Sequence, residues 1–360
     1  MVQIKVIGHS NNQKTFLWLK RSLLLMGITL AILLTACRSD QMDLGTSTIG
    51  EITLYTTLEK ELAERYLAAF NDEYPNIKVN YERHTTGVII DRLIKEKENP
   101  QADVIWSLAT SSILIAEWKE ILKAHTPQDL LKVDEPFRDS ANPPNWVGMY
   151  VWMSAFCVNM ELIEERGLPI PKSWQDLLDP VYKEQIVMPN PDSARAGFLV
   201  VSSFLEINGE AKGWENLDKL HSNIAEYSDS DSESCKLAGE GKYPIGISWG
   251  LQGIMEKEKS QPVTVIFPSE GSGWELEASA LVKKKQIKPA TKTFFNWAIS
   301  EKAMKIYAQD WAVTTVETDQ PVPEGFPSDP RAQLIDSDLP WTAANREAIL
   351  SEWVDRYDNQ

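Results

Sequence analysis

The sequence predicts an α/β protein made of two lobes, each a mainly parallel sheet flanked by helices. Short apolar strands alternate with amphipathic helices over residues 51–122, and the same alternation returns over residues 186–267. Strands that alternate with helices along a chain are typical of parallel, doubly wound sheets. Two passages on either side of the second block, at residues 134–146 and 270–274, carry the Pro, Asn and Gly of connecting segments and would link the halves.

The first block begins with an alternating strand at residues 51–56 and a helix over residues 57–74, which Pro75 ends. Two further strands at 77–81 and 103–106 follow, with helices beginning near residues 85 and 111. In such sheets ligands bind beyond the carboxyl ends of the strands. The polar residues at these ends therefore form one candidate rim, which consists of Thr56, Thr57, Thr85, Thr86 and Ser107.

The stretch 185–199 joins a short buried strand to a new helix. Pro189 and Pro191 stop the strand because proline lacks a backbone donor, and Asp192 or Ser193 is placed to cap the helix that follows. A helix N-terminus attracts anions through its free N–H groups, and Arg195 would add a forked cationic donor. The pattern favours an anion site, with an ordinary capped connection as the alternative.

The rest of the chain repeats the pattern and ends in a long helix. Residues 146–159 are rich in β-branched and aromatic side chains and are typical of a sheet. Thr342 is the expected cap of the last helix, which would begin just after Trp341 and end near Tyr357. The other expected elements are strands at 224–227, 243–248, 263–267, 278–282 and 312–316, and helices at 210–220, 233–240, 289–298 and 301–309.

The N-terminus has the pattern of a targeting segment. Basic residues up to Arg21 precede a twelve-residue apolar run at 23–34, which is too short to span a bilayer comfortably. The run ends in Leu-Thr-Ala-Cys, which resembles a bacterial lipobox and implies cleavage before Cys37 and lipid attachment to its thiol. We therefore expect a signal peptide over residues 1–36 and a flexible tether over residues 37–50, with an uncleaved anchor as the alternative.

Charge and composition limit the partners. The chain carries a net charge of -16, and removal of the four basic residues before Cys37 would lower it to -20. Such a chain does not suit nucleic acid, whose phosphates require clustered Lys and Arg. The expectation is an exported acidic protein in the periplasm or at the cell surface, held to the membrane only through its lipid.

Cys157 and Cys235 remain after the expected cleavage. An even number of cysteines in an exported chain permits a disulfide. Because a core of this size needs no cross-link, two buried free thiols are an equal alternative.

Residues 246–250, Gly-Ile-Ser-Trp-Gly, match the Gly-x-Ser-x-Gly nucleophile elbow after a predicted strand. Hydrolases with this motif have their catalytic histidine later in the chain than the serine, and no histidine follows Ser248. The preferred interpretation is an open loop that turns Ser248 and Trp249 toward a ligand. The sequence also lacks metal-ligand spacings and a phosphate-binding P-loop, so we expect no metal, no cofactor and no catalysis.

The chain from residue 51 to 357 resembles the extracellular solute-binding proteins of bacterial ABC importers, in the branch that binds ferric ion and 2-aminoethylphosphonate. The segments that carry the resemblance are LYTTLE (54–59), NPQADVIW (99–106), CKLA (235–238), YPIGIS (243–248), EGSGW (270–274) and NRE (345–347). The resemblance implies a type II periplasmic-binding-protein fold, in which two lobes close on a solute. It also implies a monomer that delivers the solute to a separate permease and ATPase.

The implied lobes comprise residues 51–145 with about 275–312, and residues 146–274 with about 313–360. Ferric-ion binders of this kind use paired tyrosines, and no Tyr-Tyr pair occurs here. The aminophosphonate branch carries Ser-Ser-Gly-Thr where this chain has Ser193-Ala194-Arg195-Ala196, so two hydroxyls are replaced and a guanidinium is gained. A small anion, with 2-aminoethylphosphonate favoured, remains the expected ligand.

The expected ligand-binding residues come from both lobes. Three alternatives to the binding of a small phosphonate remain open. The chain could be a binding protein for ferric ion or another small anion, a secreted serine hydrolase that uses Ser248, or a lipoprotein whose degenerate cleft serves assembly or sensing. The expected set is Thr56, Thr57, Thr86 and Ser107 on one wall, and Ser193, Arg195, Ser248 and Trp249 on the other.

Overall fold

A computed structural model describes residues 48–357 of the chain. The expected signal peptide, the lipid-attachment residue Cys37 and most of the tether lie outside the described residues. Within the described part, no helix combines the length and the apolar character needed to cross a membrane.

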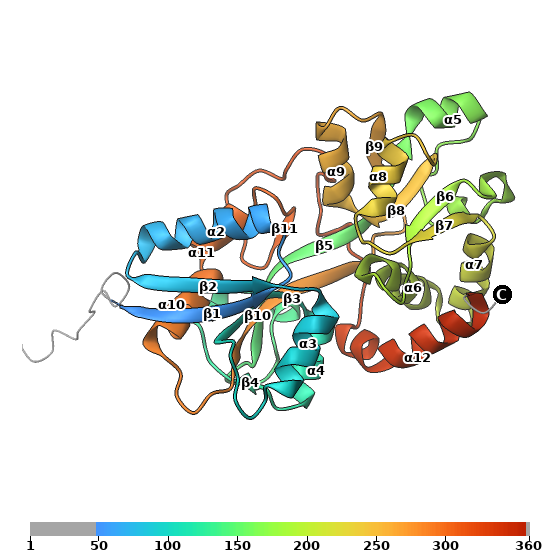
Figure 1. The fold of residues 1–360 in the computed structure, drawn as a ribbon. Coiled ribbons are helices and arrows are strands. Elements are labelled where there is room, and N and C mark those ends of the chain that lie inside the picture. The colour runs from blue at the N-terminus through green and yellow to red at the C-terminus, as the bar shows by residue number, and fades with distance from the viewer. Residues whose placement is uncertain (1–47, 358–360) are drawn as a thin grey trace, which may run out of the picture. The chain divides into compact units, whose positions relative to one another are not determined.

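The described residues form the alternating strands and helices that the sequence predicts (Figure 1). The strands are β1 (Gly50–Thr56), β2 (Ile77–Arg83), β3 (Val104–Ala109), β4 (Leu122–Lys123), β5 (Trp146–Asn159), β6 (Ile186–Pro189), β7 (Ile224–Ser228), β8 (Ile245–Trp249), β9 (Val263–Ile266), β10 (Trp274–Val282) and β11 (Val313–Thr314). The helices are α2 (Lys60–Glu73), α3 (Thr86–Lys95), α4 (Thr110–Trp118), α5 (Met160–Arg166), α6 (Arg195–Asn208), α7 (Glu210–His221), α8 (Glu233–Gly239), α9 (Gly250–Glu258), α10 (Pro289–Ala298), α11 (Glu301–Tyr307) and α12 (Leu339–Tyr357).

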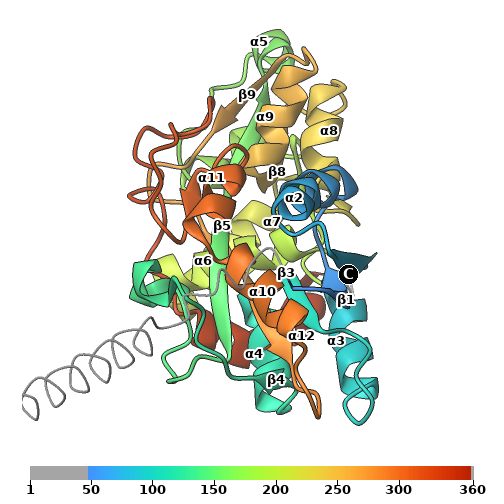
Figure 2. The ribbon, with the colours of Figure 1, turned by 90° about the vertical axis from the view of Figure 1, so that its left-hand side faces the viewer.

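One long strand, β5, joins the two halves of the sheet, whose order is β2-β1-β3-β10-β5-β8-β6-β7. Its first part pairs antiparallel with β10, from Trp146 opposite Ala280 to Met153 opposite Trp274. Its second part, from Ser154 onward, pairs antiparallel with β8 and β9. Figure 2 shows β5 running along the length of the molecule. Strands β1, β2 and β3 are parallel on one side, and β6, β7 and β8 on the other, so the predicted α/β class is confirmed.

Two hydrophobic cores lie along this sheet. The first is built on β1, β3, β10 and the start of β5, with α2, α10 and α11 packed on it. The second is built on β6, β8 and the end of β5, with α6 and α7. We call the elements around them the first and second lobes. The expected boundary at residue 146 falls at the start of a strand that serves both cores, and the lobe limits themselves stay a prediction.

Helix α12 contributes to both cores. Leu339 and Ala343 belong to the first core, whereas Ile349 and Trp353 belong to the second. The helix begins earlier than the sequence predicts, because the Asp338 carboxylate accepts the backbone N–H of Trp341 at 2.9 Å. The expected cap, Thr342, lies inside the helix.

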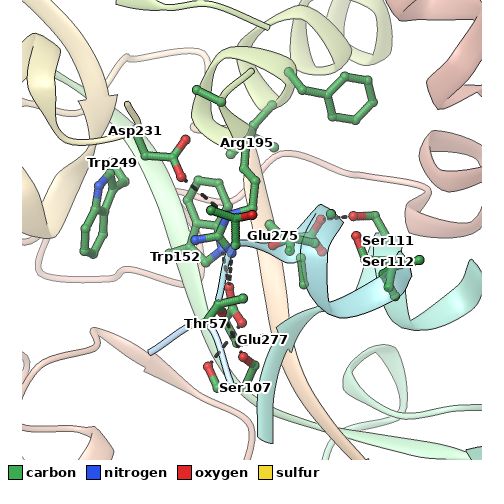
Figure 3. A pocket seen from close by; sticks show the side chains of 18 of the residues that line it. Thr57, Ser107, Ser111, Ser112, Trp152, Arg195, Asp231, Trp249, Glu275 and Glu277 are labelled. Carbon is green, nitrogen blue, oxygen red and sulfur yellow. Dashed lines mark hydrogen bonds and ion pairs between the residues drawn. The ribbon is translucent and has the colours of Figure 1, made fainter. Parts of the chain in front are cut away.

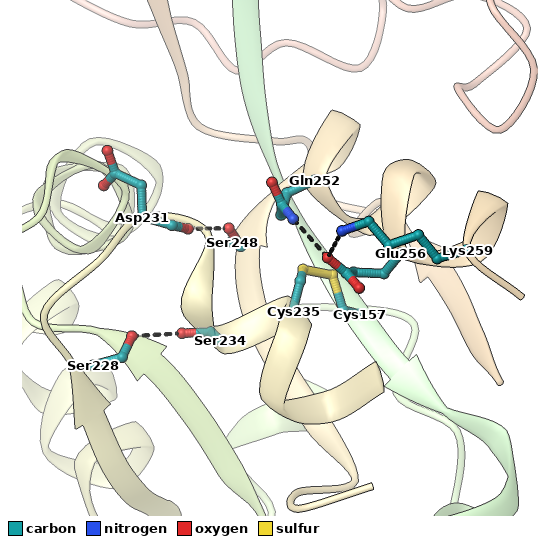
Figure 4. The surroundings of a disulfide bond; sticks show 9 residues. All are labelled: Cys157, Ser228, Asp231, Ser234, Cys235, Ser248, Gln252, Glu256 and Lys259. Atoms are coloured by element: carbon teal, nitrogen blue, oxygen red, sulfur yellow. Dashed lines mark hydrogen bonds and ion pairs between the residues drawn. A yellow bond between two sulfur atoms is a disulfide. The ribbon is translucent and has the colours of Figure 1, made fainter. Parts of the chain in front are cut away.

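A disulfide bond joins Cys157 of β5 to Cys235 of α8, with their Cα atoms 5.3 Å apart (Figure 4). Both residues are fully buried. Of the two states that the sequence left open, the structure has the bonded one. The bond ties α8, and the loop before it, to the central strand.

Candidate functional site

A cavity of about 680 Å³ opens between the two lobes (Figure 3). It receives side chains from β10, α3 and α4 of the first lobe, from α6 and the loop at 229–232 of the second, and from α12. Its size is in the range of small-molecule sites. Six of the eight predicted ligand-binding residues line it, namely Thr57, Thr86, Ser107, Ser193, Arg195 and Trp249.

The other two predicted residues, Thr56 and Ser248, do not reach the cavity. Thr56 is fully buried, and its Oγ1 accepts the backbone N–H of Leu58 at 3.1 Å. Ser248 is 1% exposed, and its hydroxyl donates to the main-chain oxygen of Asp231 (Figure 4). Each hydroxyl therefore holds a neighbouring loop. The Ser248 hydroxyl faces a carbonyl, which cannot act as the base that a nucleophilic serine requires.

Arg195 is the first residue of α6, and its charge is already paired. Its Nη1 lies 2.9 Å from Glu277 Oε1, and its Nε lies 3.4 Å from Asp231 Oδ2. The guanidinium also lies 5.5 Å above the ring of Trp152. Burial lowers the pKa of Arg195, but the two carboxylates raise it by more. The side chain therefore connects the lobes as an ion pair and offers little free charge to a ligand.

The predicted cap of α6 is wrong. Ala194 occupies the cap position, and neither Asp192 nor Ser193 caps the helix. Instead, Oδ1 of Asp231, on the loop before α8, accepts the backbone N–H of Ala196 at 2.7 Å. A carboxylate of the chain itself thus occupies the helix end at which the sequence placed an anion.

The N-terminus of α3 is open. Its cap residue, Thr85, makes no side-chain hydrogen bond, and its first turn contains no acidic residue. Thr85, Thr86 and Gly87 all line the cavity. The Thr86 Oγ1 atom is buried and has no hydrogen-bond partner in the described part of the chain. This helix end can therefore accept an anionic group from a ligand.

Two buried carboxylates form one side of the cavity. Glu275 and Glu277 are 8% and 4% exposed, and alternate positions on β10 point them to the same face. Glu277 also accepts hydrogen bonds from Ser107 Oγ at 3.1 Å and Trp152 Nε1 at 3.2 Å. Glu275 accepts the Ser111 hydroxyl at 2.6 Å. Burial and the charge of Glu277 raise the pKa of Glu275 to about 7, although the Ser111 hydrogen bond opposes the shift.

The hydroxyls of Thr57 and Ser107 are engaged within the protein. Thr57 Oγ1 donates to the carbonyl of Ser107 at 2.9 Å, and Ser107 Oγ lies 2.6 Å from the hydroxyl of Tyr150. Ser107 has a φ of 58°, in the left-handed region that non-glycine residues rarely adopt. These residues shape the wall of the cavity and stiffen it.

Aromatic rings form another part of the cavity lining. The ring of Trp311 stacks on Tyr150 with centres 4.4 Å apart, and Trp249 stacks on Trp311 at 5.6 Å. The Nε1 atom of Trp249 is buried without a hydrogen-bond partner among the described residues. Trp249 thus presents a flat surface and one spare donor.

Sequence reasoning missed three charged residues of the site. Asp231 and Glu277 pair with Arg195, and Arg346 of α12 lines the same cavity. The spacing of Glu275 and Glu277, two residues apart in a strand, could have indicated that both carboxylates lie on one face of the sheet. Among the described residues, those of this site included, no group of three or more His, Cys, Asp or Glu side chains is placed to hold a metal ion.

Comparison with known proteins gives a consistent family. Residues 99–339 match the family described as bacterial extracellular solute-binding protein. An uncharacterised protein of Haemophilus influenzae is 26% identical over 85% of this chain and 90% of its own length. A Salmonella typhimurium periplasmic protein, provisionally named for 2-aminoethylphosphonate binding, is 27% identical over 57% of each chain.

Solved structures show the same fold. The periplasmic binding protein AfuA from Actinobacillus pleuropneumoniae, with exogenous fructose-6-phosphate bound, has a TM-score of 0.76 and 24% identity, over 86% of this chain and 99% of that one. Iron-bound HitA from Pseudomonas aeruginosa has a TM-score of 0.71 and 17% identity, over 85% of this chain and 99% of that one.

Proposed function

Because the chain belongs to the family of bacterial extracellular solute-binding proteins, we propose that it captures a small anionic solute between its lobes for an ABC importer. The permease and ATPase of that importer are its expected partners. We further propose that it acts as an exported monomer in the periplasm or at the cell surface, anchored to the membrane by lipid on Cys37.

The proposal of an anionic ligand rests on the hydrogen-bonding groups at the cavity, where several donors have no partner and the buried acceptors already have one. Three buried donor groups at the cavity lack partners in the described chain, on Thr86 Oγ1, Trp249 Nε1 and Arg346 Nη1. A buried unsatisfied polar group costs roughly 1–3 kcal/mol. The deep carboxylates Glu275 and Glu277, by contrast, already accept hydrogen bonds. A ligand rich in acceptors therefore complements this cavity.

The cavity also offers a place for a cationic group. Seven acidic residues and three arginines are among its lining residues, so a ligand with only negative charge would meet net repulsion at longer range. Glu275 is placed to receive an ammonium group, because its carboxylate is buried at the cavity and each oxygen, although it accepts one hydrogen bond from Ser111 or Leu276, keeps a second lone pair. A zwitterion such as 2-aminoethylphosphonate satisfies both requirements and is the favoured ligand.

Calorimetry on the mature protein tests this function. We would titrate 2-aminoethylphosphonate, inorganic phosphate and ferric citrate, and expect saturable binding of the phosphonate. Thr86→Val should weaken binding about tenfold, through loss of one hydrogen bond to a charged group. The matched control is Thr126→Val, at an exposed position outside the cavity. Absence of heat with every small anion, or equal affinity of the Thr86 variant and the wild type, would contradict the proposal.

A further inference from the structure

We propose that Arg346 of α12, rather than Arg195, binds the anionic group of the solute and sets a preference for oxyanions. The inference rests on the proposed capture of an anionic solute, and it assigns the charged contact to one residue. The two arginines line the same cavity but differ in what their guanidinium groups already contact.

Arg195 is committed to the protein. Ion pairs with Glu277 and Asp231 use its Nη1 and Nε atoms, and these carboxylates come from different lobes. A solute that bound Arg195 in place of these contacts would break its ion pairs with Glu277 and Asp231. Breaking a buried ion pair in this way is strongly unfavourable.

Arg346 is available. Its Nη1 is buried without a hydrogen-bond partner, and it makes no ion pair within the described residues. Its guanidinium carbon lies 4.4 Å from the centre of the Phe198 ring, so the ring supports the plane of the charged group. Burial lowers the pKa of Arg346, although the charges of Glu275 and Asp192 oppose the shift. An arginine stays protonated in such a place, and an anion would restore the lost interactions.

The geometry of the group indicates the class of ligand. A planar guanidinium donates two parallel hydrogen bonds to the oxygens of a carboxylate, phosphate or phosphonate. A neutral polyol offers no such pair of charged acceptors. The open N-terminus of α3 lines the same cavity as Arg346 and can receive a remaining oxygen. We therefore expect selection for a terminal oxyanion.

The position of Arg346 also connects the contact to both lobes. The residue lies on α12 between Ala343, which is part of the first core, and Ile349, which is part of the second. Figure 1 shows α12 below α6, running from the side of α4 toward α7. An oxyanion held here would contact the helix that packs on both halves, close to the place where they meet.

The test compares three variants of the mature protein by calorimetry with 2-aminoethylphosphonate and inorganic phosphate. Arg346→Gln should lose about 100-fold in affinity, as expected for two charge-assisted hydrogen bonds, and Arg346→Lys about tenfold, because lysine cannot fork. The matched control is Arg356→Gln. It removes the same charge from the same helix, where Arg356 stacks on Trp214 at 5.0 Å outside the cavity, and it should bind like the wild type.

The outcomes separate this inference from the proposed function. If the wild type binds an anion and Arg346→Gln binds it equally well, Arg346 is not the anchor, and the proposed function survives. If the wild type binds neither probe, the proposed anion capture fails and this inference fails with it. Melting curves check the fold of each variant; should Arg346→Gln not fold, the Arg346→Lys affinity decides, and equality with the wild type overturns the proposal.

Discussion

Replacing Glu275 by Gln should stabilise the protein, by an amount that grows with pH. The side chain is 8% exposed, and burial together with Glu277 raises its pKa from the ordinary value of 4.5 to about 7. Below pH 4.5 the carboxyl is protonated in both the folded and the unfolded chain. As the pH rises toward 7, the unfolded chain loses this proton first, so the folded state loses stability over that window.

The expected gain in stability follows from the pKa shift of Glu275. Each pKa unit corresponds to about 1.36 kcal/mol, so a shift from 4.5 to about 7 costs the folded state about 3 kcal/mol above pH 7. Gln does not ionise, and its one side-chain oxygen can still accept either the Ser111 hydroxyl or the Leu276 N–H, which the two carboxylate oxygens of Glu275 accept. The Glu275→Gln variant should therefore be more stable by about 3 kcal/mol at pH 8 and by less than about 1 kcal/mol at pH 5.

Urea unfolding without added solute measures this difference. With a slope of about 3 kcal/mol per molar, the midpoint at pH 8 should rise by about 1 M. Glu98→Gln, at an exposed position, is the control and should change stability by less than about 0.5 kcal/mol at either pH. The reasoning is refuted if Glu275→Gln shifts the midpoint equally at pH 5 and pH 8, or destabilises the protein at pH 8.

Two further predictions concern stability. Replacing both Cys157 and Cys235 by Ser should cost about 4 kcal/mol, because the bond closes a loop across 78 residues; an unchanged urea midpoint would count against this. Gly197→Ala should cost more than about 2 kcal/mol, because its Cβ would overlap the carbonyl oxygen of Pro189. Gly87→Ala, where nothing lies within 4 Å, should gain up to about 1 kcal/mol; equal melting temperatures of the two glycine variants would contradict the packing argument.

The strands and helices could be read from local pattern because each follows from neighbours in the chain. The strand at Ile52 and Leu54 alternates, and the helix that follows buries Tyr66 and Phe70 one turn apart. The start of α12 was misplaced by a few residues because Asp338, rather than Thr342, receives the first free amides. The first residue of a helix depends on which of several nearby polar side chains accepts its free backbone N–H groups.

The site was only partly predictable, because its chemistry depends on partners far away in sequence. Hydroxyls and Arg195 were found from their places at strand and helix ends. That Arg195 is neutralised depends on Glu277, 82 residues away, and the cap of α6 depends on Asp231, 35 residues away. Ser248 matched a motif and yet turns inward to a backbone carbonyl. No periodicity reports such pairings.

The order of strands and helices, and with it the α/β class, was determined by the sequence alone, because hydrophobic periodicity and turn residues act over a few positions. The tertiary structure decided which polar side chains form ion pairs or hydrogen bonds within the protein and which remain able to contact a ligand. Arg195 and Arg346 are the same residue type and line the same cavity, but only the fold brings two carboxylates to Arg195 and leaves Arg346 without an ion pair among the described residues. Hydrogen bonds and charges are satisfied by whatever lies within a few ångströms, and that neighbourhood exists only after the lobes have formed.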